Sequence, residues 1–176
     1  EIMKPVHVPT DIRRDSFQKR SIVLLQGVFE PRVFDHLKGK KPKEIFLLEG
    51  RPSLAAARNS CQQLRKRKII PTLISDNMAG FLFFQDWVKE IWVSYQEVAQ
   101  DGALCEVGAL ILGILGKRHK VPLYLFPGKP GNKFIGDAKE ILSFQGKRVA
   151  PFGIRGYAPL VEWLPGKYIT KIISIE

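Results

Sequence analysis

The sequence contains no apolar run long enough to cross a bilayer. A membrane-spanning helix needs about 20 consecutive apolar residues, whereas the longest apolar run here, Ala103–Leu115, is interrupted by Glu106. Residues 1–20 also lack the apolar segment and the small-residue cleavage site of a secretory signal. We therefore expect no membrane partner, and we interpret Ala103–Leu115 as part of a buried helix.

Cysteine and histidine are scarce, which argues against the usual metal and redox centres. The two cysteines, Cys61 and Cys105, lie far apart without the spacing of metal ligands. Structural disulfides are rare in the reducing cytosol, so we expect a cytoplasmic protein in which both cysteines are packing residues. The three histidines are scattered among basic residues and suggest neither a metal site nor a nucleophile's partner. No metal and no cofactor are predicted.

Acidic residues are outnumbered by basic ones, 17 to 28, for a formal net charge of +11. Such an excess indicates either an anionic partner or a strongly solvated surface. Each of three basic clusters precedes a predicted strand, so they should lie at the sheet edge opposite a ligand crevice, and they lack interleaved aromatic residues. Solvation is the favoured explanation, ahead of a nucleic acid or an acidic protein partner. The clusters are Lys38–Lys43, Arg65–Lys68 and Lys117–Lys120.

Short runs of β-forming residues alternate with segments of helical period through most of the chain. A length of 176 residues suits one domain with a core and is too short for two ordinary ones. The alternation predicts a single α/β domain over residues 21–176, with a Rossmann-like parallel β-sheet and helices on both faces. Residues 1–20 are predicted to form an N-terminal arm or a reduced helical segment. The predicted strands are Ser21–Leu25, Glu44–Leu48, Thr72–Ser75, Glu90–Tyr95, Leu123–Phe126 and Tyr168–Ile175.

Helical signals lie between these strands. Asp76 ends the third strand and can cap the helix that follows it. The segment Cys105–His119 is apolar almost all round, which predicts a central helix or one at a subunit interface. Glycine and proline punctuate Pro127–Arg155, where we expect loops and a short helix near Gly136–Leu142. Another helix should follow Arg51-Pro52, and its buried face is expected to carry Leu54, Ala57, Cys61 and Leu64.

Four segments resemble motifs of one protein family. Glu49-Gly-Arg-Pro52 is similar to a Glu-Thr-Arg-Pro signature, and Ile70-Pro-Thr-Leu-Ile-Ser-Asp-Asn-Met-Ala79 is close to Pro-Val-Thr-Leu-Ile-Thr-Asp-Asn-Met-Ala. Gly116–Phe126 and Pro165–Ser174 resemble the approach to the family's fifth strand and its C-terminal ending. The family comprises the alpha, beta and delta subunits of translation initiation factor 2B and the methylthioribose-1-phosphate isomerases. The resemblance covers their C-terminal nucleotide-binding-like domain, whereas their N-terminal helical domain would be missing or reduced to residues 1–20.

The residues that carry proton transfer in the family's isomerases are replaced in this chain. Where the resemblance places a catalytic cysteine after the first strand, the chain has Gln26, followed by Gly27. Where it places a catalytic aspartate after the fourth strand, the chain has Gln96, with Glu97 at the position of an arginine. Glutamine forms hydrogen bonds but cannot act as a general acid or base. The family's phosphate-handling positions have changed as well, to Ala55, Cys105-Glu106, Ala158 and Glu162.

The candidate ligand- and phosphate-binding residues are Gln26, Gly27, Arg51, Arg58, Asp76, Asn77 and Gln96. Arg51 can bind a phosphate beside the N-terminus of its helix, or it can form a structural pair with Glu49 or Asp76. Helix capping is the favoured role of Asp76 and Asn77, with ligand contact as an addition.

The catalytic candidates are Glu97, Asp101 and Glu106, which we expect on one strand-to-helix connection. There they can act as a displaced acid/base pair for enediol chemistry. The favoured interpretation is structural, because acidic residues in the first turn of a helix complement its dipole.

The replaced proton carriers favour a noncatalytic family member, an initiation factor 2B alpha-like binding or regulatory module with a degenerate phosphate, nucleotide or sugar-phosphate site. The alternative is an aldose–ketose isomerase, similar to methylthioribose-1-phosphate or ribose-1,5-bisphosphate isomerases, that uses the displaced carboxylates. The resemblance also implies a phosphorylated small molecule as ligand and a homodimer as the assembly. Cys105–His119 is the expected contact helix because it has few polar positions.

Overall fold

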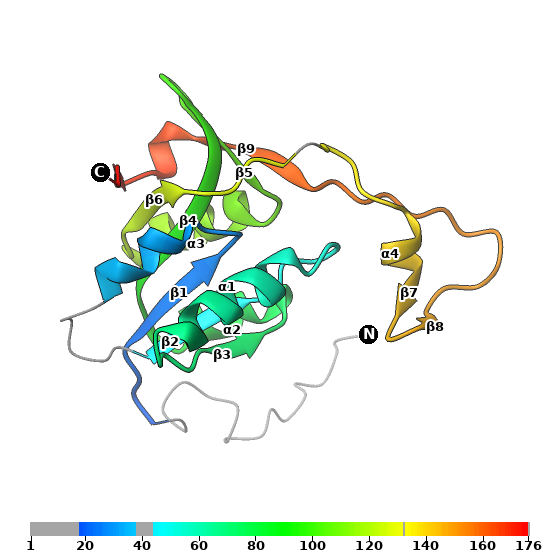
Figure 1. The fold of residues 1–176 in the computed structure, drawn as a ribbon, viewed down its shortest axis with the longest axis horizontal. Coiled ribbons are helices and arrows are strands. Elements are labelled where there is room, and N and C mark those ends of the chain that lie inside the picture. The colour runs from blue at the N-terminus through cyan, green and yellow to red at the C-terminus, as the bar shows by residue number, and fades with distance from the viewer. Residues whose placement is uncertain (1–17, 38–43, 132, 176) are drawn as a thin grey trace, which may run out of the picture.

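The computed structural model describes residues 18–37, 44–131 and 133–175. Within these ranges, no helix combines the length and the apolar character that a bilayer crossing requires. Most of this part of the chain forms one sheet with helices packed against it (Figure 1). Residues 1–17 of the predicted arm and the basic cluster Lys38–Lys43 lie outside the described residues.

Six strands form the parallel body of the sheet among the described residues. They are β1 Ile22–Gln26, β2 Glu44–Leu48, β3 Thr72–Ile74, β4 Val88–Ala99, β6 Leu123–Pro127 and β10 Lys171–Ile172. Their order is β10-β6-β4-β1-β2-β3. Every residue of the central strand β1 is buried, which explains why Ile22–Leu25 is a continuous apolar run. Because these strands are parallel, the carboxyl ends of β1 to β4 point to one edge, as predicted.

Helices cover both faces of the sheet, at the bounds η3 Pro31–Leu37, α1 Ala55–Lys66, η4 Asp76–Met78, α2 Ala79–Phe84 and α3 Ala109–His119. Side chains of β1 alternate between the two faces. Val23 and Leu25 share a core cluster with η3 and α1, whereas Ile22 and Leu24 share one with α2 and α3. The predicted Rossmann-like architecture, with helices on both faces, is confirmed.

The buried face of α1 differs from the predicted one. Ala56, Ser60 and Leu64 are buried, whereas Leu54 precedes the helix in a left-handed conformation with a φ of 56°. The helix therefore begins at Ala55 rather than directly after Pro52. Its helical period is as predicted, and of the predicted face Leu64 is buried and Cys61 packs against the core. The fully buried face is rotated to Ala56 and Ser60, whereas Ala57 is only half-buried.

A hairpin replaces the first part of the predicted helix Cys105–His119. β4 continues past its parallel neighbour β6 and turns into β5 (Gly102–Glu106), which runs antiparallel to β4. β5 pairs on its other side with the antiparallel strand β9 (Val161–Pro165). Cys105 is thus a buried strand residue, and α3 begins only at Ala109. A short apolar run does not reveal by its periodicity whether it is a buried strand or a buried helix.

Residues 134–157 form a projecting loop that stands apart from the sheet (Figure 1). The loop contains α4 (Lys139–Leu142) and a hairpin of β7 (Ser143–Phe144) and β8 (Lys147–Arg148). α4 confirms the predicted short helix, whereas the hairpin was not predicted. The chain returns through β9 and the 3-10 turn η5 (Gly166–Tyr168) to β10. The final strand is therefore much shorter than predicted.

Candidate active site

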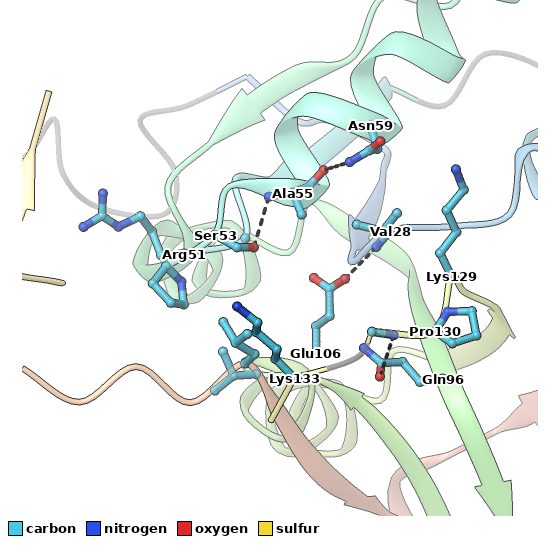
Figure 2. Close-up of a pocket in the computed structure, with 15 residues that line it drawn as sticks. Val28, Arg51, Ser53, Ala55, Asn59, Gln96, Glu106, Lys129, Pro130 and Lys133 are labelled. Carbon is cyan, nitrogen blue, oxygen red and sulfur yellow. Dashed lines mark hydrogen bonds between the residues drawn. The ribbon is translucent and has the colours of Figure 1, made fainter. Parts of the chain in front are cut away.

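A cavity of about 460 Å³ opens at the carboxyl ends of the parallel strands (Figure 2). Its walls come from the segments that follow β1, β2 and β6, from the far part of β4, from the end of β5 and from the first turn of α1. Open α/β sheets bind ligands at this edge. The cavity is therefore the candidate site, and each sequence-based candidate can be placed relative to it.

Glu106, at the end of β5, is the carboxylate among the described residues that line the cavity. Its Oε1 accepts a hydrogen bond from the Val28 N–H at 3.1 Å (Figure 2). Burial raises the pKa of Glu106 and the charge of Asp76 adds to the rise, while the Val28 hydrogen bond opposes it. The carboxyl group therefore keeps its proton to a higher pH than a free glutamate, which brings it closer to the range useful for proton transfer.

The other walls of the cavity carry cations and hydrogen-bond donors. Lys129 and Lys133 follow β6 and line the cavity. Ser53 lies just before α1, and its Oγ accepts a hydrogen bond from the N–H of Ala55, the first residue of the helix, at 3.2 Å. Asn59 lines the cavity one helical turn after Ala55. A helix N-terminus and nearby lysines attract anions. The cavity therefore combines groups suited to a phosphate with one carboxylate suited to proton transfer.

Asp76 braces the loop that leads into α1. Its two carboxylate oxygens accept hydrogen bonds from the backbone N–H groups of Gly50, at 2.9 Å, and Arg51, at 2.7 Å. The predicted role as cap of its own helix is wrong, because the N-cap position of η4 is Ser75 and no side chain caps it. The carboxylate instead fixes the backbone at the rim of the cavity.

Arg51 lines the cavity but directs its guanidinium elsewhere. Nη2 donates a hydrogen bond to the Glu140 carbonyl at 3.1 Å, and the guanidinium carbon lies 5.3 Å from the centre of the Phe144 ring. Figure 2 shows the side chain pointing away from Glu106. Arg51 contacts Asp76 through its backbone N–H, so the expected side-chain pair is not what joins them. The guanidinium connects the body of the domain to the projecting loop.

Gln26 and Gly27 hold neighbouring segments together behind the cavity lining. Gln26 is buried, and its Nε2 donates a hydrogen bond to the Val107 carbonyl at 2.7 Å. The Gly27 carbonyl accepts a hydrogen bond from the Ser60 hydroxyl at 2.9 Å, which ties β1 to α1. Neither Gln26 nor Gly27 is among the described residues that line the cavity.

The remaining candidates divide between the cavity and the surface. Gln96 lines the cavity, and its Oε1 accepts a hydrogen bond from the Gly131 N–H at 3.2 Å. Arg58 and Asn77 are exposed and lie outside the lining. Glu97 and Asp101 are also exposed, on β4 and in the β4–β5 turn. The three carboxylates thus lie on a hairpin rather than on one strand-to-helix connection, and the structure brings only Glu106 into the cavity.

The N-terminus of α3 is occupied by the chain's own carboxylate. Glu162 Oε1 accepts hydrogen bonds from the N–H groups of Gly108, at 2.7 Å, and Leu110, at 2.8 Å.

Burial, with the charges of Glu162 and Glu106, raises the pKa of Cys105 to about 12. Cys105 is therefore a neutral packing residue at neutral pH, and α3 offers its first N–H groups to Glu162.

Four residues that line the cavity were not predicted from the sequence: Lys129, Lys133, Ser53 and Asn59. Both lysines lie in the segment that follows β6, so the rule that pointed to the ends of β2 and β3 could have found them. Ser53 and Asn59 carry no sequence signal of this kind.

The two described basic clusters lie at the other end of the sheet, as predicted. Arg65–Lys68 and Lys117–Lys120 begin in the last turns of α1 and α3 and end just after them. Arg67 donates to Asp35 Oδ1 at 3.0 Å and to the Pro31 carbonyl at 2.7 Å, so part of this charge has a structural role.

Comparisons with known proteins agree with this architecture. The chain is 35% identical to the methylthioribose-1-phosphate isomerase of Syntrophus aciditrophicus over 76% of this chain and 40% of that protein. It is 30% identical to the enzyme of the same name from Thermus thermophilus over 75% of this chain and 44% of that protein. The chain therefore spans less than half the length of these curated relatives.

Solved structures show the same fold. The translation initiation factor eIF-2B subunit delta from A. fulgidus superimposes with a TM-score of 0.75 at 19% identity, over 92% of this chain and 54% of that chain. The 5-methylthioribose 1-phosphate isomerase from Pyrococcus horikoshii gives a TM-score of 0.72 at 25% identity, over 92% and 51%. Residues 30–175 match the model of the initiation factor 2 subunit family. On this match, with the fold and the motifs that agree with it, the chain belongs to the initiation factor 2 subunit family.

Proposed function

We propose that the cavity binds a phosphorylated sugar and that Glu106 catalyses its aldose–ketose isomerisation. The observation that carries the proposal is a carboxylate of raised pKa facing a cavity whose other walls supply lysines and a helix N-terminus. Relatives named methylthioribose-1-phosphate isomerase support the isomerase alternative over the noncatalytic module favoured by the sequence. Isomerisation of a sugar requires one well-placed group that can both accept and return a proton.

In the proposed reaction, the Glu106 carboxylate removes the proton from C2 of the sugar and returns it to C1 through an enediol-type intermediate that the electron pair left on C2 forms with C1. In an aldose with a free C1 aldehyde, the O2 proton moves to O1. In a 1-phosphate, O1 stays bonded to the phosphate, the C1–O4 ring bond breaks and O4 takes the O2 proton, so in both cases the product ketose has the same atoms as the substrate. The Val28 N–H fixes the orientation of the carboxylate, and partial burial limits competing water.

Lys129, Lys133 and the first turn of α1 are the proposed phosphate-binding groups. The charge of the lysines and the positive end of the helix dipole stabilise a dianion without taking part in proton transfer. Gln96 lines the same cavity and can hydrogen-bond a sugar hydroxyl. Because Gln26 and Gln96 cannot move protons, both proton transfers on carbon are assigned to Glu106.

The proposal is tested by proton exchange in deuterated water. Methylthioribose 1-phosphate and a panel of open-chain aldose phosphates are incubated with the protein, and loss of the C2 proton signal is followed by NMR. We expect exchange with at least one phosphorylated sugar and none with its unphosphorylated counterpart. Tight binding without exchange would support the noncatalytic module instead, and absence of binding to every sugar phosphate would reject the assignment of the cavity.

We further propose that the chain forms a homodimer through the outer surface of α3. Ile111 is 62% exposed and Ile114 is 47% exposed on this helix, and an exposed apolar surface of this kind marks an interaction site. α2, which packs beside α3, adds the exposed side chains of Phe81 and Phe84. Leu115, the other residue considered from the sequence, packs against the core instead.

Ile111→Lys is therefore expected to shift the protein from dimer to monomer in sedimentation velocity while its circular dichroism stays unchanged. The charged side chain can remain solvated in the monomer but not in a buried interface. Val149→Lys is the matched control, because Val149 is 60% exposed but lies on the projecting loop. A wild-type protein that sediments as a monomer contradicts the proposal.

A further inference from the structure

The projecting loop exposes aromatic side chains to an unusual degree. Phe152 is 90% exposed, Tyr157 is 72% exposed and Phe134 is 67% exposed, and Phe144 is 47% exposed beside Arg51. Isolated exposed apolar residues are normal, but several large rings on one short segment indicate an interaction surface. None of these four rings lines the cavity, so the candidate active site does not account for them.

The part of this loop that follows α4, residues 143–157, has positive charge and no negative charge, whereas Asp137 and Glu140 lie in the first part of the loop. Lys147, Arg148 and Arg155 lie among the aromatic residues, and the sequence contains no aspartate or glutamate from residue 141 to residue 161. The described basic clusters at the ends of α1 and α3 differ from this loop, because the rings that they contact, Phe34 and Tyr168, are buried or half-buried. An anionic partner is therefore attracted to a surface that also offers planar apolar contacts.

Arg148 holds Phe152 in place. Its Nε donates a hydrogen bond to the Ala150 carbonyl at 2.7 Å, and its Nη2 donates to the Pro151 carbonyl at 2.9 Å. The guanidinium carbon lies 4.7 Å from the centre of the Phe152 ring, within cation–π range. One side chain thus fixes the turn and packs on the ring. A ring presented in this way loses little conformational entropy when a flat partner stacks on it.

These features fit a polyanion that carries accessible planar groups. We propose that the projecting loop binds single-stranded nucleic acid, with bases stacked on Phe152 and Tyr157 and phosphates paired with Lys147, Arg148 and Arg155. Base–aromatic stacking and backbone neutralisation together are the basis of sequence-tolerant single-strand binding. The acidic groups of a peptide can pair with the cations, but they do not stack on Phe152 and Tyr157 as nucleobases do. A bilayer would bury the guanidinium that is fixed on Phe152, which is costly.

The test measures binding of a fluorescent oligouridine of about 12 nucleotides, a typical single-strand site size, by anisotropy with the full chain. We expect salt-dependent binding, and weaker binding of the same sequence as a duplex, because paired bases cannot stack on the rings. The double variant Phe152→Ala, Tyr157→Ala should weaken binding by about tenfold or more, given the strength of base–aromatic stacking. Arg148→Gln should weaken binding and lower its dependence on salt.

The matched control is Val149→Ala, Ile154→Ala, which removes exposed aliphatic side chains from the same loop and should leave binding unchanged. Equal binding by the wild type and the aromatic double variant overturns the proposal in favour of plain charge attraction. Absence of binding at low salt also overturns it. The proposal is also overturned if the protein binds phosphatidylserine vesicles more tightly than oligouridine and if the Val149→Ala, Ile154→Ala variant loses this vesicle binding. That result would assign the loop to a lipid surface.

Discussion

Glu106→Gln is expected to lower the rate of C2 proton exchange by about 10²- to 10⁴-fold, the usual contribution of a general acid or base. The substitution keeps the length of the side chain and an oxygen that can accept the Val28 hydrogen bond. It removes the group that takes and returns the proton. The loss should therefore appear in kcat, while the affinity for the sugar phosphate, measured by calorimetry, stays close to that of the wild type.

Glu97→Gln is the matched control for this loss. Glu97 is an exposed carboxylate on β4 outside the cavity lining, so its neutralisation should leave the exchange rate unchanged. The same holds for Asp101, which lies in the β4–β5 turn. If exchange survives Glu106→Gln but is abolished by Glu97→Gln, then Glu97 is the carboxylate that moves the proton and the assignment to Glu106 is wrong.

The pH dependence of stability gives a second readout of Glu106. Burial is the main cause of its raised pKa, so the folded state binds the proton more tightly than the unfolded state does. The resulting stabilisation is fully present below the ordinary pKa of glutamate and is lost as the pH rises through the raised folded-state pKa. Urea unfolding should show that Glu106→Gln lacks this decline and gains stability relative to the wild type as the pH increases.

The parallel core of the fold was predictable because its residues are buried on both faces. Ile22–Leu25 and Glu44–Leu48 are apolar runs bounded by turn residues, and the helical segments between strands carry clear periodicity. Such signals depend on local sequence alone. They were sufficient to predict that the carboxyl ends of the strands share one edge of the sheet and that helices cover both of its faces.

The β4–β5 hairpin was not predictable in the same way, although it determines the site. β5 is fully paired by β4 and β9, and β9 lies more than fifty residues further along the sequence. The local sequence Ala103–Leu115 contains no indication of that distant pairing, and its apolar residues suit a helix equally well. Only the hairpin carries Glu106 into the cavity while leaving Glu97 and Asp101 in solvent.

The roles of the motif residues Asp76 and Arg51 depend on hydrogen-bond partners that lie far away in the sequence and could not be predicted from it. Asp76 was expected to act on its own helix, yet it bonds backbone groups 25 and 26 residues earlier. Arg51 was expected either at a phosphate or in a structural pair with Glu49 or Asp76, yet its guanidinium reaches Glu140, 89 residues later. The motif therefore identified the correct edge of the sheet, but not which atom at that edge faces a ligand.

Gly27→Ala is expected to destabilise the fold by about 3 kcal/mol, the sum of two separate costs. Gly27 has a φ of 104°, a conformation that costs a residue with a side chain about 1–2 kcal/mol. A Cβ at this position would also overlap the hydroxyl of Ser94, which is buried on β4. Overpacking in a closed interior adds about 1–3 kcal/mol. The change also disturbs the carbonyl that accepts the Ser60 hydrogen bond from α1.

Gly146→Ala separates the two costs. Gly146 has a φ of 75° in the turn of the β7–β8 hairpin, and an added Cβ there meets no atom within 4 Å. The loss in free energy of unfolding that Gly146→Ala causes, measured with urea, therefore reports only the cost of the positive φ. In a Ser94→Gly background the overlap is relieved, so Gly27→Ala should then cost about as much as Gly146→Ala, a coupling that a double-mutant cycle measures. If Gly27→Ala costs no more than Gly146→Ala in the wild-type background, then β1 and β4 do not approach each other at the active-site edge as closely as the structure requires. The position of Gln26 behind the cavity, which depends on this close approach, would then be wrong as well.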